Sequence, residues 1–183
     1  MSLVRRFKTF CAGVAAAGAI ACSGGPPAGD HDSSNLVQNA NFSLRDGTGV
    51  PTGFEYAPND CVRLRVESNV LRLDKIADGD FPQSLPALPL PVEEGAEYEF
   101  RIDMRTERFF TWVFSEVEIQ DAAGRSLGWF GSERKLSGNT PWTVLTGRFR
   151  TPPGATRAYW MLARSYDFLG GSIWLRNPSF EKK

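Results

Sequence analysis

The stretch FTWVFSEVEIQ, residues 110–120, alternates between two kinds of side chain. Val113, Ser115, Val117 and Ile119 fall on one side of an extended chain, and all but the small Ser115 are apolar. Because the side chains of a strand point alternately to opposite faces, this side predicts a surface that faces a core. The opposite side mixes aromatic and polar residues: Trp112, Phe114, Glu116, Glu118 and Gln120.

The same alternation recurs along the chain after Asn35, and no stretch has a helical period. EYEFRIDM, residues 97–104, alternates most cleanly, with Tyr98 and Phe100 on its apolar side. Short runs of this kind, separated by glycine and proline turns, are typical of a β-sandwich or a barrel. LPALPLPVEEG is rich in proline, which favours an edge strand. The other expected strands are CVRLRV, VLRLD, TVLTGRFR, RAYWMLAR and SIWLRNPSF.

The composition is that of an ordinary globular protein. Of the 183 residues, 42% are apolar and 23% are charged, and the formal net charge is zero. Residues 1–21 contain three basic residues and no acidic one, so the remainder of the chain has 18 basic against 21 acidic residues. This balance excludes the basic stripe of a nucleic-acid-binding protein.

Residues 1–21 have the features of a secretory signal peptide. Arg5, Arg6 and Lys8 precede a short apolar stretch, TFCAGVAAAGAIA, which is too brief for a membrane-spanning helix of about 20 residues. AIAC, residues 19–22, resembles a bacterial lipobox, in which Cys22 is lipidated and becomes the mature N-terminus. The alternative is ordinary cleavage, because Ala19-Ile20-Ala21 is itself an A-x-A site.

Residues 22–34 are expected to be a flexible tether between a lipid anchor and a folded domain at 35–183. The segment SGGPPAGDHDSS is rich in glycine, proline and serine, as such linkers are. Cys11 lies in the signal peptide and Cys22 would be acylated, so Cys61 is the single cysteine left in the domain. We therefore expect no internal disulfide, and we interpret Cys61 as a small buried apolar residue.

The order of landmarks in the domain is more specific than its strand pattern. NLVQNANFS is followed by GVPTGF, then by VEEGAEYEF and DAAGRSLG, and the chain closes with PWTVLTGRFRTPPGATRAYW and GGSIWLRNPSFE. This order resembles the CenC-type carbohydrate-binding modules of families four, nine and twenty-two over residues 35–181. The resemblance implies a galactose-binding-like jelly roll, a β-sandwich of two antiparallel sheets, with the ligand on the concave face or at the loops of one end. It also implies that Trp142 is a buried structural tryptophan.

The sequence departs from this family at the acidic residues that commonly hold a structural calcium. Ser43 follows Phe42 where a glutamate is frequent, and Arg176-Asn177 replaces a pair of acidic residues. Calcium requires several oxygen ligands, preferably charged ones. We therefore predict no cofactor and no metal, with a structural calcium as the alternative.

The resemblance places residues 112–120 on a strand of the sheet with the concave face. Sugars have apolar C–H faces ringed by hydroxyl groups, so their binding sites combine flat aromatic rings with carboxylates. Trp112, Phe114, Glu116 and Glu118 supply both, and Trp129 and Tyr166 are expected to add aromatic rings in or near loops. The alternative is that these aromatic residues pack in the core or under a loop.

A catalytic centre is not predicted. The single histidine, His31, lies in the tether, which excludes a Ser-His or Cys-His dyad within the domain. Glu116 and Glu118 would lie about 7 Å apart on an open face, where the sequence shows nothing to raise the pKa of either. The pair is interpreted as part of a solvated polar face.

Two classes of function remain. The first is a non-catalytic, lipid-anchored protein of the bacterial cell envelope that binds a poly- or oligosaccharide. The second is a structural or protein-interaction module with the same fold, and fold alone does not separate the two. Aromatic residues exposed beside acids would favour the first class, and a broad flat apolar patch would favour the second.

Overall fold

The computed structural model describes residues 34–55, 61–77, 88–164 and 170–183. Every regular element in these ranges is a β-strand, and all strand pairs are antiparallel, which confirms the all-β prediction. None of the described segments is a helix long and apolar enough to cross a membrane. The strands are β1 (Val62–Glu67), β2 (Val70–Lys75), β3 (Leu88–Pro91), β4 (Glu97–Gln120), β5 (Ser126–Gly131), β6 (Leu136–Arg150), β7 (Arg157–Arg164) and β8 (Ser172–Lys182).

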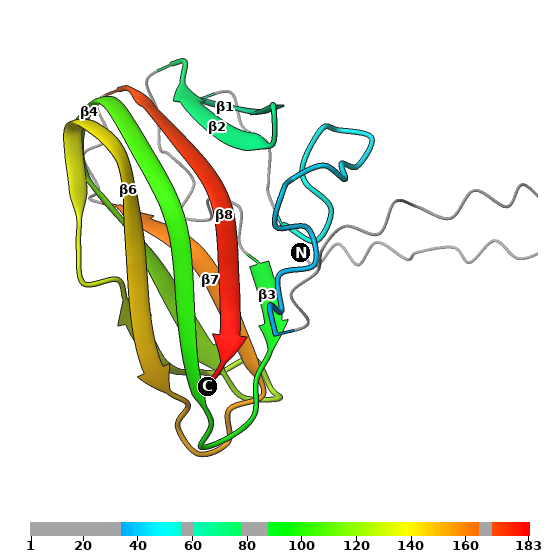
Figure 1. The fold of residues 1–183 in the computed structure, drawn as a ribbon. Helices are drawn as coiled ribbons and strands as arrows, with labels where there is room; N and C mark the ends of the chain where they lie inside the picture. The colour runs from blue at the N-terminus through cyan, green and yellow to red at the C-terminus, as the bar shows by residue number, and fades with distance from the viewer. Residues whose placement is uncertain (1–33, 56–60, 78–87, 165–169) are drawn as a thin grey trace, which may run out of the picture. The chain divides into compact units, whose positions relative to one another are not determined.

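Strand β4 belongs to both layers of the sandwich. The sequence predicted two strands at 97–104 and 110–120, but the structure has one continuous strand of 24 residues. Its first half pairs with β8, its second half pairs with β7 and β5, and β6 pairs along its first two thirds. The expected two sheets are therefore one eight-stranded sheet that folds over (Figure 1). Six strands follow one another in the order β1-β2-β8-β4-β7-β3, and β5 and β6 each pair with β4 outside this order.

The bend in β4 lies between Met104 and Val113, where its pairing with β6 shifts register three times. Arg108 has a φ of 52°, and its backbone N–H donates a hydrogen bond of 2.7 Å to Asn139 Oδ1. Such irregularities increase the local bend and twist of a strand. Because this stretch contains neither glycine nor proline, no residue pattern in it distinguishes a bend from a loop.

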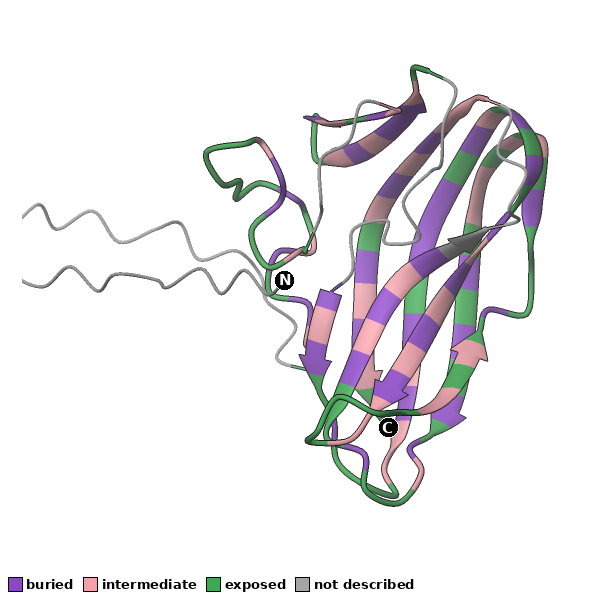
Figure 2. Ribbon diagram, turned by 180° about the vertical axis from the view of Figure 1, so that it is seen from behind, coloured by how far each residue is buried: buried purple, intermediate pink, exposed green. Residues whose placement is uncertain are grey.

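The core lies between the two layers. The ring of Trp160 on β7 lies 6.1 Å from that of Phe100 on β4 and 6.1 Å from that of Phe180 on β8, measured between centroids. Phe149 on β6 stacks on Phe130 of β5 at 4.8 Å. Buried residues alternate with more exposed ones along the strands (Figure 2), so each layer turns one face inward and one face outward.

The asparagines and the phenylalanine of NLVQNANF have structural roles. Asn35 Oδ1 accepts a hydrogen bond of 3.0 Å from the N–H of Phe180, which ties the start of the domain to β8. Asn39 Nδ2 donates to the carbonyl of Leu44 at 2.7 Å and holds the next loop. Phe42 is fully buried, with a φ of 54°. These residues fix the N-terminal segment to the sandwich.

We expect Gly147→Ala to destabilise the fold. Gly147 on β6 is opposite Phe100 on β4, and a methyl group at this position would overlap the Phe100 ring. Overpacking of this kind costs about 1–3 kcal/mol of unfolding free energy. Gly128→Ala is the control, since its nearest side-chain atom, in Phe130, lies at 3.5 Å. Chemical denaturation measures both variants, and equal stabilities would contradict the close packing of Phe100 on β6.

Candidate functional site

The second half of β4 separates core residues from outward-facing ones, as its alternation predicts. Val113 and Val117 are fully buried between the layers. Ser115 lies on the same inward side and is also fully buried, whereas Phe114 and Glu116 point away from the core and remain partly exposed. The outward-facing candidates on β4 are Trp112, Phe114, Glu116 and Glu118.

One end of this surface is aromatic. Trp112 is 38% exposed, and its ring lies 5.4 Å from that of Phe114, with the two planes inclined at 38°. Lys135 Nζ lies 4.4 Å from the Trp112 ring and 5.1 Å from the Phe114 ring. Phe110, which is 72% exposed, extends the stripe. Sequence reasoning omitted Phe110 and Lys135, although the period of two puts Phe110 on the same side as Trp112.

Glu116 lies at the centre of the surface and is half-buried. It is opposite Gly131 of β5 on one side and Met161 of β7 on the other. Burial raises the pKa of its carboxyl, the positive charge of Lys135 opposes this, and the charge of Glu118 adds to it. The sequence-based statement that nothing raises the pKa of either glutamate was therefore wrong for Glu116, because the desolvation comes from neighbouring strands.

A row of three side chains crosses the surface beside Glu116. Glu118 on β4 is opposite Trp129 of β5 and Tyr159 of β7. Residues in such register have Cβ atoms about 4.5–5.5 Å apart and point to the same side of a sheet. Glu118 Oε2 also accepts a hydrogen bond of 3.1 Å from Gln120 Nε2. The row combines an acid with an aromatic ring on each side.

Trp129 was predicted in or near a loop, and the structure places it in a strand, two residues before that strand ends. It lies within β5, which forms a hairpin with β4, and its side chain is 52% exposed. The turn of the hairpin is closed by Asp121, whose Oδ1 accepts hydrogen bonds from the N–H groups of Ala123 and Arg125 at 3.0 and 2.9 Å. The Asp-Ala-Ala-Gly landmark of the sequence is therefore the turn of this hairpin.

Three other candidates have different outcomes. Tyr166 and Cys22 lie outside the described residues, so their assignments stay predictions. The expected burial of Trp142 was wrong, because its side chain lies on the outward side of β6 with the Arg176 guanidinium 4.2 Å from its ring. The buried tryptophan is Trp160, whose Nε1 donates a hydrogen bond of 2.6 Å to Ser115 Oγ.

The residues that replace the family's acidic pair contact an acid themselves. Arg176 Nε and Asn177 Nδ2 donate to Asp103 Oδ2 at 3.2 and 3.0 Å. Within the ranges that the structure describes, no group of three or more histidine, cysteine, aspartate and glutamate side chains could hold a metal ion. That the domain needs no calcium stays a prediction.

The outward surface of the second layer, called the platform below, offers two kinds of interaction side by side. Aromatic rings can stack on flat apolar groups, while carboxylates, an ammonium and a phenol can exchange hydrogen bonds with hydroxyl groups. A polyhydroxylated ligand with an apolar face matches both. The platform consists of Phe110, Trp112, Phe114, Glu116, Glu118, Trp129, Lys135 and Tyr159.

Comparisons with known proteins identify the fold. The sequence matches no protein-family model and has no significant match among curated proteins. A solved structure of CBM4, a carbohydrate-binding module, matches with a TM-score of 0.53 and 8% identity over 80% of this chain and 99% of that one. The chain therefore has the β-sandwich fold of a carbohydrate-binding module, as the ordered landmarks predicted.

Two larger proteins contain a similar domain. The arabinose-bound MgGH51 α-L-arabinofuranosidase matches with a TM-score of 0.59 and 16% identity, over 81% of this chain and 26% of that one. The enzymatically active domain of bacteriophage CBA120 tailspike protein 4 matches with a TM-score of 0.55 and 15% identity, over 81% and 21%. The chain thus spans about a quarter of the first and a fifth of the second.

We expect Glu116→Gln to stabilise the fold at neutral pH. Because the pKa of Glu116 is raised in the folded state above its ordinary 4.5, its charged form opposes folding at higher pH. The advantage of the variant should disappear as the pH falls below 4.5, where Glu116 becomes protonated in both the folded and the unfolded state. Denaturation of both proteins between neutral and acidic pH measures this, and an advantage that grows on acidification would contradict it.

Proposed function

We propose that this protein is a non-catalytic carbohydrate-binding protein whose platform binds a poly- or oligosaccharide. The observation that carries the proposal is the row of Trp129, Glu118 and Tyr159 beside the exposed pair of Trp112 and Phe114. Aromatic rings match the C–H faces of sugar rings, and the acids match their hydroxyl groups. The fold shared with CBM4 over nearly the whole of that module supports the same function.

The arrangement of the acids favours binding over glycoside hydrolysis. Glycosidases place two carboxyl groups on either side of the scissile bond. Glu116 and Glu118 project from the same face of one strand, about 7 Å apart, so both would approach a ligand from the same side. The two enzymes with a similar domain have chains about four to five times as long as the region they share with this protein.

The test of the platform compares two substitutions on β4. Trp112→Ala removes a stacking surface that is already partly exposed, so it should weaken binding to a polysaccharide at least tenfold. Its unfolding free energy should fall by under about 1 kcal/mol, the size of the cation–π contact with Lys135. Val117→Ala removes a fully buried side chain and should lower stability by about 1–3 kcal/mol without a direct effect on binding.

A glycan array finds the ligand, and affinity measurements with the two variants then test the site. Ile76→Ala is a matched control, because Ile76 is exposed and directly follows β2, which belongs to the other layer. A loss of about 3–5 kcal/mol in Trp112→Ala would mean that Trp112 is a core residue and would refute its role in the platform. Unchanged affinity in Trp112→Ala would refute it as well.

The second candidate function, a protein-interaction module, is favoured by one observation. Phe110 is 72% exposed next to Trp112, and exposed aromatic residues are also enriched at protein interfaces. The two functions differ in their ligands. Binding of a protein partner that Phe110→Ala abolishes, together with a glycan array without any hit, would favour this second function.

The anchor is proposed separately from the platform. We propose that Cys22 carries a lipid and that residues 22–34 tether the domain to a membrane of the bacterial cell envelope. The charged start, the short apolar stretch and the Gly/Pro/Ser-rich segment support this proposal. Cys22→Ser should move the protein from the membrane fraction to the soluble fraction. A soluble wild type that fractionates like the variant would refute the anchor.

A further inference from the structure

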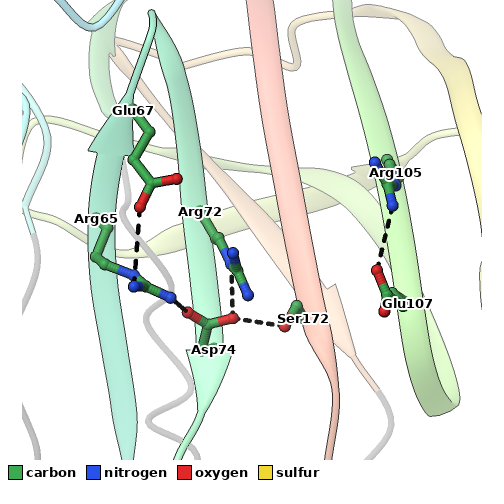
Figure 3. A network of polar contacts seen from close by, with 7 residues as sticks. All are labelled: Arg65, Glu67, Arg72, Asp74, Arg105, Glu107 and Ser172. Atoms are coloured by element: carbon green, nitrogen blue, oxygen red, sulfur yellow. Dashed lines mark hydrogen bonds and ion pairs between the residues drawn. The ribbon is translucent and has the colours of Figure 1, made fainter.

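The outward side of the first layer, opposite to the platform, carries tryptophans stacked with arginines. Trp174 on β8 is in register with Arg72 of β2 and Arg105 of β4. The guanidinium carbons of the two arginines lie 4.8 and 4.7 Å from the centre of the Trp174 ring. Figure 3 shows Arg72 and Arg105 on the strands to either side of β8. The stacked tryptophan fixes the positions of both guanidinium groups.

A buried carboxylate orders the arginines further. Asp74 is 7% exposed and accepts hydrogen bonds from Arg65, from Arg72 Nε at 2.8 Å and from Ser172 Oγ at 2.5 Å (Figure 3). Burial by itself would raise the pKa of Asp74, but the hydrogen bonds from Ser172, Arg65 and Arg72 outweigh it and lower the pKa. Asp74 therefore stays ionised at neutral pH and holds the arginines in place.

An open recess of about 550 Å³ lies beside this cluster. Arg105 and Glu107 of β4 form one side of it, and Asn139, Thr140 and Trp142 of β6 are among the residues that form the other. The second guanidinium close to the recess is that of Arg176, 4.2 Å from the Trp142 ring. The recess therefore brings together an aromatic ring, an amide, a hydroxyl group and the ion pair of Arg105 with Glu107, and the guanidinium of Arg176 lies next to its Trp142 wall.

Arginines outnumber carboxylates only slightly on this side of the layer, so the donor geometry of the arginines matters more than the net charge. The arginines that point outward are Arg63, Arg65, Arg72, Arg101, Arg105, Arg148, Arg150 and Arg176. The carboxylates on the same side are Glu67, Asp74, Glu97, Glu99, Asp103, Glu107 and Glu181. A guanidinium has five N–H donors in a planar fork, so an arginine that already has one acidic partner can bind a second anion. The surface thus favours an anionic ligand.

We propose that this recess is a second saccharide site and that it binds acidic sugars, which carry a carboxylate or a sulfate group. Arg105 and Arg176 bind the acidic group, since an arginine fork fits such groups with two parallel hydrogen bonds. The half-exposed ring of Trp142 packs on the sugar ring, and Asn139 and Thr140 lie within the same recess for its hydroxyl groups. The inference goes beyond the platform, whose half-buried acids Glu116 and Glu118 would repel an anionic sugar.

The competing explanation is that the arginine–tryptophan stacks only hold β2, β8 and β4 together. In that case their loss would lower stability and leave the protein without affinity for acidic sugars. The two explanations differ in a binding measurement, so stability alone does not decide between them.

The experiment titrates the full-length protein with an oligogalacturonate, a uronic acid oligomer, by calorimetry at low salt. A neutral gluco-oligosaccharide of the same length is the matched ligand. We expect the wild type to bind the acidic oligomer, with Arg105→Gln and Trp142→Ala each weakening it at least tenfold. Arg148→Gln is the control for charge alone, because Arg148 is an exposed arginine on the same side, further along β6, and should bind as the wild type does.

Further outcomes separate the two sites and test the fold of the variants. Trp112→Ala, which alters the platform, should keep its affinity for the acidic oligomer. The proposal for the recess can therefore be refuted without refuting the platform, and the platform can be refuted without refuting the recess. Thermal melting must show that Arg105→Gln and Trp142→Ala are folded. Arg105→Lys keeps the positive charge but loses the planar fork of N–H donors, so it should also bind the acidic oligomer more weakly than the wild type does. A wild type without affinity for the oligomer, or variants at residues 105 and 142 with unchanged affinity, would overturn the proposal.

Discussion

The whole sandwich depends on one strand that takes part in both of its layers. The first half of β4 pairs with β8 and its second half with β7, so the two layers are joined by backbone hydrogen bonds within a single sheet. The bend near Arg108 permits this, because it turns the strand without interrupting the chain. Rings from both layers, such as Phe100 and Trp160, then meet between them and exclude water from the core.

The same strand couples the core to the platform. Side chains alternate along β4, so burial of Val113 and Val117 forces Trp112 and Glu116 outward. The hydrogen bond from Trp160 Nε1 to Ser115 Oγ fixes β4 against β7 from the inner side. The platform is consequently built on the central strand of a rigid layer rather than on loops, which keeps its aromatic and acidic groups in fixed positions for a ligand.

The two outward surfaces differ in their charge because their aromatic residues have different neighbours. On the platform, Trp129 and Tyr159 flank an acid, Glu118, and the surface suits hydroxyl groups that donate hydrogen bonds. On the opposite side, arginines stack on Trp174, and the surface suits groups that accept hydrogen bonds. One fold thus presents two binding chemistries, which we propose serve a poly- or oligosaccharide on the platform and an acidic sugar on the opposite side.

The sequence by itself determined the strand class, the inward and outward sides of each strand and the order of landmarks, because a period of two and the turn residues are local properties. It also placed Trp112, Phe114 and Glu116 on the same side of one strand, since side chains two residues apart point to the same face. Only the tertiary structure decided that Trp129 and Tyr159 flank Glu118, that Glu116 is desolvated and that Trp142 faces outward. These depend on which strands pair and in what register, and on the bend in β4, and no local pattern in the sequence specifies a long-range pairing.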